Sequence, residues 1–382
     1  MDKNTQIPYN LTMYDLPAIE TNGQAFARCV AQARPYAPVQ VKIKITWRCN
    51  LRCEMCNVWR QERRNALTPE RLRSLADELV DLGCRKIHLS GGEVLLRPDL
   101  YDLISYLSNK GVRVNLTTNG TLITRDVALR LADSGLRGAS ISIDSPQRRI
   151  HDRIRGQGAW KRALKGLREL RRAQEKRRAK LRIRINTIIS RTNYESLADL
   201  AAFVHQRGAD RLTLIPVDDA SGDLWLNKTR LRHYNAHVAP RIADEGVDAG
   251  LFTPTNDPSK AFPFGSTKRE LNYSRYGFYA RGLYESQPCY APWTHALVTP
   301  RGRVYACCMT RSEQPLGDLR KASFHQIWEN TAYQNLRRAM CDVTPYAICH
   351  HCDDFLDANR FLHQVRQQWN GNPTQKEKAH RI

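Results

Sequence analysis

Three cysteines stand close enough in the sequence to share a metal cluster, at positions 49, 53 and 56. The stretch from Cys49 to Cys56 reads CNLRCEMC and follows a strand-like run over 41–46, so three thiolates lie on one short loop. Ordinary electron-transfer ferredoxins close a [4Fe–4S] cluster with four cysteines, whereas three thiolates leave one iron open to an exchangeable ligand. The alternatives are a zinc site, which takes four ligands, and buried cysteines that bind nothing.

Polar motifs also follow the next strand-like runs. Ser90-Gly91-Gly92-Glu93 ends the second run; its glycines let the backbone approach a ligand closely, and its carboxylate can accept from an ammonium group. Alone, such a turn is more often a plain loop, but one strand–helix unit after the cysteines it predicts a ligand site. Later strand ends are also polar, and they can equally serve as turns and helix caps; they read Thr117-Thr118-Asn119-Gly120 and Ser142-Ile143-Asp144-Ser145.

A second group of cysteines lies near the end of the chain. Twelve residues separate Cys289 from Gly302 and four more precede Cys307; Cys341 and the CxxC of Cys349 and Cys352 follow. The run 297–304 is predicted to form a hairpin that turns at Pro300-Arg301-Gly302. Four thiolates from a hairpin and a later CxxC suit either zinc or a second [4Fe–4S] cluster.

The first set of motifs resembles the radical S-adenosylmethionine (SAM) superfamily over roughly residues 40–217. The resemblance implies that the open iron is chelated by SAM, and that one electron from the cluster cleaves SAM to a 5′-deoxyadenosyl radical, which abstracts hydrogen from the substrate. Met55 replaces the aromatic residue that the family often has near the adenine; a thioether can also pack on a ring.

The same resemblance implies a SAM-binding set. Gly91, Gly92 and Glu93 match the motif that holds the SAM amino group. Thr117, Asn119, Ser142 and Asp144 match positions that line SAM, with Ser142 near the ribose. Arg184 and Asn186 are expected to share one face of a strand. The resemblance to the molybdenum-cofactor GTP cyclase implies that Arg184 holds the SAM carboxylate and Asn186 a ribose hydroxyl.

The C-terminal cysteines resemble the first part of the SPASM pattern, in which a glycine lies between two cysteines. Because only one later CxxC follows, the region resembles the shortened "twitch" domain, which holds one auxiliary [4Fe–4S] cluster. The implied ligands are Cys289, Cys307, Cys349 and Cys352. Cys308 is an alternative to Cys307, and three further side chains are candidate ligands, namely Cys341, His350 and His351.

The elements that position these motifs alternate regularly between 41 and 217. Six strand-like runs are predicted, at 41–46, 86–89, 113–116, 139–143, 181–189 and 211–216. Five amphipathic helices lie between them, at 69–82, 100–109, 125–133, 160–178 and 194–206. Such alternation predicts right-handed βαβ units and a parallel sheet, with the chemistry at the carboxyl ends of its strands.

The predicted fold class is therefore α/β: a partial (β/α)6 TIM-like radical SAM barrel with a small C-terminal Cys-rich twitch/SPASM-like domain. The predicted divisions are an N-terminal extension at 1–40, the barrel at 41–217, a helix and connector or substrate-covering segment at 218–288, the auxiliary-cluster domain at 289–360 and a C-terminal tail at 361–382.

The charge of the chain is its main compositional anomaly, at +22 over 382 residues. Seventeen lysines and arginines but only three acidic residues lie between 148 and 191. We interpret this run as a solvated helix face, or as a surface for an acidic flavodoxin or ferredoxin electron donor, nucleic acid or anionic lipid. Nucleic acid is not favoured, since no aromatic residues are interleaved for stacking.

The sequence predicts no membrane span and no secretory signal, which indicates a cytoplasmic protein. We expect a radical SAM oxidoreductase that oxidises a small polar metabolite, with the auxiliary cluster accepting the electron. The alternative is a peptide-modifying maturase or an epimerase, which would use Cys308 or Cys341 as a hydrogen-atom donor. A different class is a cluster- or zinc-containing nucleic-acid-binding protein.

Overall fold

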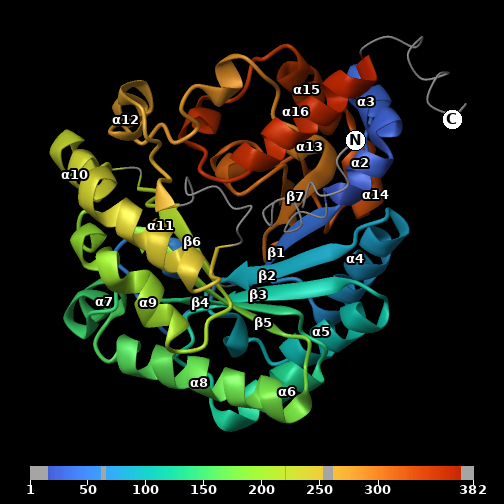
Figure 1. Cartoon of the computed structure of the whole chain (residues 1–382). Coiled ribbons are helices and arrows are strands. Elements are labelled where there is room, and N and C mark those ends of the chain that lie inside the picture. The colour runs from blue at the N-terminus through green and yellow to red at the C-terminus, as the bar shows by residue number, and fades with distance from the viewer. Residues whose placement is uncertain (1–15, 62–65, 220, 253–260, 371–382) are drawn as a thin grey trace, which may run out of the picture.

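A parallel sheet of six strands forms the centre of the protein (Figure 1). The computed structural model describes residues 16–61, 66–219, 221–252 and 261–370. The six predicted strands are confirmed, as β1 (Gln40–Thr46), β2 (Lys86–Gly91), β3 (Arg113–Thr118), β4 (Gly138–Ser142), β5 (Arg182–Ile189) and β6 (Arg211–Pro216). Each pairs in parallel with the next one along the chain, so all six carboxyl ends meet at one edge.

Helices between the strands cover the outer face of this sheet (Figure 1). They are α4 (Pro69–Asp81), α5 (Leu100–Asn109), α6 (Arg125–Asp133), α8 (Ala159–Arg177) and, after a 3₁₀ turn at Tyr194–Asp199, α9 (Leu200–His205). Thr68 begins α4, where its side chain accepts from the Arg71 amide, and Pro69 supplies the fixed φ of the first turn. Among the helices between the barrel strands, the short α7 (Arg148–Arg155) was not predicted, because only Ile150 and Ile154 of its eight residues are apolar and four are arginines.

Alternation along the strands separates an apolar outer face from a polar inner face. On β5, Ile183 and Ile185 are fully buried under the helices, whereas Arg184 and Asn186 point to the inner side and stay half-buried. On β1, Lys44 shares the inner face with Lys42. The inside of the barrel is therefore lined by groups that can bind polar ligands, which places the candidate site there.

The C-terminal cysteine region continues the same sheet. β7 (His295–Val298) pairs in parallel with β1, and β8 (Arg303–Tyr305) and β9 (Gly317–Asp318) follow in antiparallel pairing. The predicted hairpin is confirmed, with Gly302 at φ +82° in its turn. The sheet order is β6-β5-β4-β3-β2-β1-β7-β8-β9, and the sheet does not close into a complete barrel.

The two ends of the described chain pack against each other beside β1 (Figure 1). Near the amino end are α2 (Pro17–Thr21) and α3 (Gly23–Ala31); α14 (Phe324–Glu329), α15 (Thr331–Cys341) and α16 (Leu356–Asn370) follow the hairpin. The predicted C-terminal tail is thus helical up to Asn370, because Leu362 and Val365 are buried on a face that packs against α3. Residues 371–382 lie outside the described residues.

Between the barrel and the hairpin lie α10 (Lys228–His233), a π-helical turn (Tyr234–Val238), α11 (Ala239–Asp248), α12 (Lys268–Ser274) and the short α13 (Ala291–Thr294). The described part of the predicted connector is packed against the rest of the protein: Tyr234 donates to the Ala261 carbonyl at 2.7 Å, and Tyr279 donates to the Val217 carbonyl at 3.1 Å. Residues 253–260 lie outside the described part. No helix in the described ranges is long and apolar enough to cross a membrane.

Candidate active site

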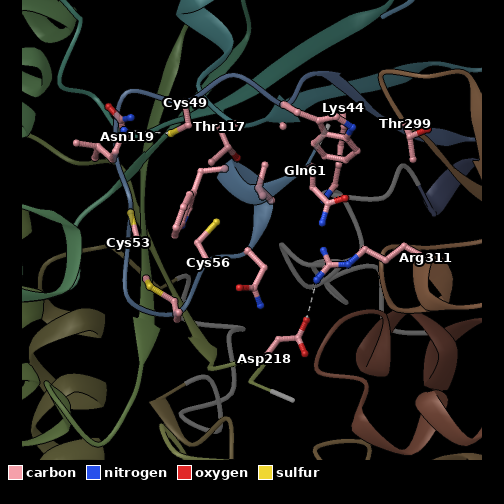
Figure 2. A pocket seen from close by; sticks show the side chains of 18 of the residues that line it. Lys44, Cys49, Cys53, Cys56, Gln61, Thr117, Asn119, Asp218, Thr299 and Arg311 are labelled. Atoms are coloured by element: carbon pink, nitrogen blue, oxygen red, sulfur yellow. Dashed lines mark hydrogen bonds and ion pairs between the residues drawn. The ribbon is translucent and has the colours of Figure 1, made fainter. Parts of the chain in front are cut away.

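A cavity of about 590 Å³ lies at the carboxyl ends of the strands (Figure 2). Two parts of the chain form its walls: the barrel with its cysteine loop, and the C-terminal hairpin with the 3₁₀ turn Met309–Ser312. The volume falls within the range of roughly 300–1,000 Å³ that is usual for ligand sites. The predicted location of the chemistry, at the strand ends, therefore coincides with this cavity.

The cysteine loop contributes all three of its thiols to the cavity: Cys49, Cys53 and Cys56. None of them forms a disulfide, and the Leu51 amide donates to the sulfur of Cys49 at 3.5 Å. Burial raises the pKa of the Cys53 thiol to about 11, while the Arg155 cation opposes that shift. Three free thiols on one wall are the donor set that a [4Fe–4S] cluster with one open iron requires, and cluster binding would displace their protons.

Arg155, which was not predicted as a site residue, adjoins the cysteine loop. Its Nη1 lies 3.9 Å from the Cys53 sulfur. Its Nε donates to Asp144 at 2.5 Å and its Nη2 donates to the same carboxylate at 3.2 Å. Asp144 also accepts from the Ile188 amide at 2.9 Å and is fully buried. The structure thus places Asp144 behind Arg155 and off the cavity wall, where it orients a cation toward the thiols.

The Gly91-Gly92-Glu93 turn lies directly against the start of the cysteine loop. The Gly92 amide donates to the Thr46 carbonyl and the Glu93 amide to the Arg48 carbonyl, both at 2.8 Å. Gly91 and Gly92 line the cavity; Glu93 is fully buried beneath it. The Glu93 carboxylate accepts from Thr118 Oγ1 at 2.7 Å and from the Asn119 amide at 2.8 Å. These bonds show Glu93 joining two strand ends; a direct bond to SAM stays a prediction.

Substituting Gly91 tests how strictly this turn is built. A Cβ at Gly91 would lie 2.2 Å from the Thr46 carbonyl oxygen, and its φ is +138°. We expect Gly91→Ala to cost about 2–5 kcal/mol, because backbone strain and overpacking add, and to lower iron content after reconstitution. Gly111 is the matched control: its φ is +80° but no atom lies within 4 Å, so Gly111→Ala costs only about 1–2 kcal/mol. Equal losses of thermal stability in the two variants would contradict the role of the Thr46 contact.

Four other predicted SAM-binding residues line the cavity: Met55, Thr117, Asn119 and Ser142. The Asn119 side chain also donates to Asn50 Oδ1 at 2.8 Å, which fastens the cysteine loop to the end of β3. Besides Glu93 and Asp144, two more predicted residues do not reach the wall. Arg184 and Asn186 lie deeper on the face of β5 that carries the cavity-lining Ile188. Their assignment to the carboxylate and ribose of SAM stays a prediction.

The four predicted auxiliary ligands gather beneath the hairpin. Asn359 Nδ2 donates to the Cys289 sulfur at 3.5 Å and to the Tyr284 hydroxyl at 2.7 Å, and that hydroxyl lies 4.0 Å from the Cys352 sulfur. Burial raises the pKa of the Cys307 thiol to about 11, and the nearby Cys289 adds to the shift. The pKa of Cys349 is raised by burial and then by the Cys289 and Cys307 thiols. All four are free thiols, which suits a cluster.

The remaining candidate ligands point elsewhere. The Cys308 thiol faces Asp354 Oδ2 at 3.9 Å, and the same carboxylate lies 3.7 Å from the Lys42 ammonium. Cys341 donates to the Val30 carbonyl at 3.4 Å, against α3. The His351 ring lies 4.7 Å from that of Phe278. Neither Cys308 nor Cys341 is among the described residues that line the cavity, so their role as hydrogen-atom donors stays a prediction. In the described ranges, no three His, Cys, Asp or Glu side chains are placed to share a single metal ion.

Comparison with known proteins agrees with both cysteine regions. Residues 43–204 match the model of the radical SAM superfamily, and residues 289–353 match that of the SPASM iron–sulfur cluster-binding domain. The chain is 33% identical over 321 residues to the AdoMet-dependent heme synthase of Nitratidesulfovibrio vulgaris, which covers 76% of this chain and 78% of that protein. It is 26% identical over 322 residues to the mycofactocin maturase MftC of Mycobacterium tuberculosis, covering 83% and 77% of the two chains.

The fold has solved counterparts as well. Streptococcus suis SuiB bound to S-adenosylmethionine has a TM-score of 0.62 at 18% identity, covering 86% of this chain and 75% of SuiB. The chain therefore belongs to the radical SAM superfamily. Within that superfamily it is an enzyme with a C-terminal SPASM domain. Its cofactors are therefore SAM, a [4Fe–4S] cluster that binds SAM, and auxiliary iron–sulfur clusters.

Proposed function

We propose that this protein is a radical SAM enzyme that modifies a peptide. When bound, the first cluster and SAM supply a 5′-deoxyadenosyl radical that abstracts a hydrogen atom. Two relatives, named a mycofactocin maturase and a PqqA peptide cyclase, favour the peptide-modifying alternative over the predicted oxidation of a small polar metabolite. SuiB has also been solved with its precursor peptide SuiA.

The observation that carries the proposal is that the barrel and the C-terminal hairpin together form the cavity. Its 590 Å³ must hold the first cluster, SAM and the reacting part of the substrate. A substrate that inserts one side chain suits this space better than one that must be enclosed whole. The cysteine loop and the strand ends form one wall, and residues of the hairpin, such as Thr299 and Tyr305, form the other. A peptide side chain can enter between these walls while the rest of the peptide stays outside.

The chain's own residues have three roles in this proposal. Cys49, Cys53 and Cys56 hold the first cluster, and Arg155 keeps a cation beside it. Asn119 and Glu93 fix the loops that surround SAM. Cys289, Cys307, Cys349 and Cys352 would hold an auxiliary cluster, which would supply an electron acceptor when bound.

The test uses anaerobically reconstituted and reduced protein with SAM. A pool of synthetic peptides is expected to raise the formation of 5′-deoxyadenosine above the substrate-free rate, and mass spectrometry should find a peptide of changed mass. Formation of 5′-deoxyadenosine that no peptide stimulates would reject the peptide proposal while leaving the radical SAM assignment intact.

A second candidate is a reaction on a tetrapyrrole. It is favoured by one comparison, since the 33% identity to a heme synthase exceeds the 26% identity to the maturase. Four basic residues that line the cavity, Lys44, Arg301, Arg303 and Arg311, also suit the carboxylates of such a molecule. Stimulation by a carboxylated porphyrin but by no peptide would favour this candidate.

We also propose that an acidic flavodoxin or ferredoxin reduces the first cluster from the side of α7 and α8. Ala159, at the start of α8, is buried against Leu51 and Cys53 of the cysteine loop. The Glu54 amide donates to the Ile154 carbonyl of α7 at 2.8 Å. The basic run therefore begins at the cluster site. A cytoplasmic location, where such donors occur, stays a prediction.

Charge reversal on α8 checks this proposal. Lys161 and Lys165 are exposed near the cysteine loop, whereas Lys176 and Lys180 are exposed at the far end, with Lys161 and Lys176 roughly 22 Å apart along the helix. We expect Lys161→Glu/Lys165→Glu to slow flavodoxin-driven SAM cleavage by about tenfold or more, since steering by charge is lost, and to spare dithionite-driven cleavage. Lys176→Glu/Lys180→Glu is the control, because it makes the same change in charge at a distance from Lys161 that exceeds the Debye length. Equal loss with both reductants would exclude docking at this end.

A further inference from the structure

Lys44 is a buried cation that faces the cavity without an acidic partner. It lies on the inner side of β1 and is only 8% exposed. Among the described residues, no carboxylate lies within ion-pair distance of its ammonium. The ammonium nitrogen lies 5.4 Å from the centroid of the Trp47 ring. Burial lowers the pKa of Lys44 to about 8, and the Arg311 cation adds to that shift. A buried ammonium without a counter-charge is costly, so its presence at a cavity wall indicates an anion that arrives from outside.

Arginines of the C-terminal domain surround the same part of the cavity. We call the four basic residues that line this part of the cavity the cationic wall: Lys44, Arg301, Arg303 and Arg311. Asp218 is the sole carboxylate among the described residues that line the cavity, and it lies 3.3 Å from Arg311. Arg155 does not belong to this wall, since the buried Asp144 carboxylate holds it through two hydrogen bonds. Arg311, by contrast, meets Asp218 in a single contact between two exposed side chains, so it can still bind another anion. Positive charge therefore exceeds negative charge on the side formed by β1 and the hairpin.

The position of the cationic wall separates it from the cluster. Figure 2 shows Lys44 and Arg311 on one side of the cavity, Cys49 and Cys53 on the other, and Cys56 between them. An anion bound by Lys44 and Arg311 thus sits across the cavity from the cysteine loop. The space between the two is where the reacting carbon of a substrate would lie.

We propose that Lys44 and Arg311 bind a carboxylate of the substrate and so position the carbon that loses its hydrogen. The proposal rests on the proposed function and names its substrate class: a peptide whose inserted side chain is acidic. An ammonium and a guanidinium together recognise a carboxylate through charge-assisted hydrogen bonds. Lys44 and Arg311 are positioning and specificity residues in this reaction.

Protection of Lys44 from acetylation tests the proposal without needing turnover. The reconstituted, SAM-loaded protein is treated with sulfo-N-hydroxysuccinimide acetate, and modification of Lys44 is followed by peptide mass spectrometry, with exposed Lys161 as the internal control. The probes are the peptides acetyl-Gly-Glu-Gly-amide and acetyl-Gly-Gln-Gly-amide. We expect the glutamyl peptide to slow labelling of Lys44 about fivefold at about four times its Kd, because protection scales as 1 + [L]/Kd, and the glutaminyl peptide to have no effect. Arg311→Gln should remove most of the protection.

Other outcomes are decisive as well. Equal protection by both peptides, no protection by either, or full protection by SAM alone would overturn the carboxylate site. Protection by inorganic phosphate as strong as that by the glutamyl peptide would also overturn it. A carboxylated porphyrin, compared with its methyl ester, separates the two sources of the carboxylate. Protection by that porphyrin alone would keep the site and reject the peptide. Protection by the glutamyl peptide without any peptide modification would keep the site and reject the proposed function.

Discussion

Replacing Cys53 with alanine should remove about four of about eight irons per chain and reduce 5′-deoxyadenosine formation to the level of the reagent blank. Cys53 faces the cavity together with Cys49 and Cys56, and the described chain offers no other thiol on that wall. Two thiols hold a cluster poorly, and SAM then has no open iron to bind. Iron and sulfide analysis of the anaerobically reconstituted variant measures the first effect, and chromatography of the reduced reaction measures the second.

The auxiliary site gives the complementary result. Cys349→Ala should also remove about four irons, while SAM cleavage persists because the first cluster is intact. Cys307 and Cys308 form a matched pair of neighbours. Cys307→Ser should lose the auxiliary irons, whereas Cys308→Ser should retain them, because the Cys308 thiol faces Asp354 rather than the other three thiols. About four irons in the parent protein, unchanged by Cys349→Ala, would exclude an auxiliary cluster.

Replacing Arg155 with methionine should destabilise the protein by about 3–5 kcal/mol. The change leaves the Asp144 carboxylate fully buried without its cation, although the Ile188 amide still donates to it. The double variant Arg155→Met/Asp144→Asn removes both charges and should recover much of the loss. Urea midpoints of the reconstituted proteins measure the difference. If the double variant loses as much stability as the sum of the losses in the two single variants, the ion pair is not the cause.

The same variant should change the cluster itself. A cation 3.9 Å from the Cys53 sulfur stabilises the more negative, reduced cluster, so Arg155→Met should make the reduction potential more negative. Arg155→Lys keeps the charge but loses the two-pronged contact with Asp144, and it should shift the potential less. Electron paramagnetic resonance titration of a protein that also carries Cys349→Ala isolates the first cluster. Identical potentials in the methionine and lysine variants would assign the effect to structure rather than charge.

Much of the fold follows from local patterns. Val41, Ile43 and Ile45 alternate with polar residues on β1, and Leu72, Leu75 and Leu79 recur at helical spacing on α4. Such periods depend on neighbours in the chain, so the six strands and the helices between them were predictable. The regions that differ are those where distant segments compete: 361–370 becomes helical because α3 covers it, and the segment around Tyr234 and Tyr279 is packed by tyrosine hydroxyls bonded to remote carbonyls.

The site divides in the same way. The three thiols at 49, 53 and 56 and the glycine turn after the next strand could be identified from the sequence, because their spacing is a local property; the later cysteines could be identified from their CxxC and Cys–Gly–Cys spacing. Which basic residues line the cavity follows from the tertiary structure alone. Arg155 is one of seventeen cations in a uniform run, and Lys44 meets Arg311 because β7 pairs with β1. A charge acquires its role from burial and from partners that are distant in the chain, and neither is encoded in the local pattern.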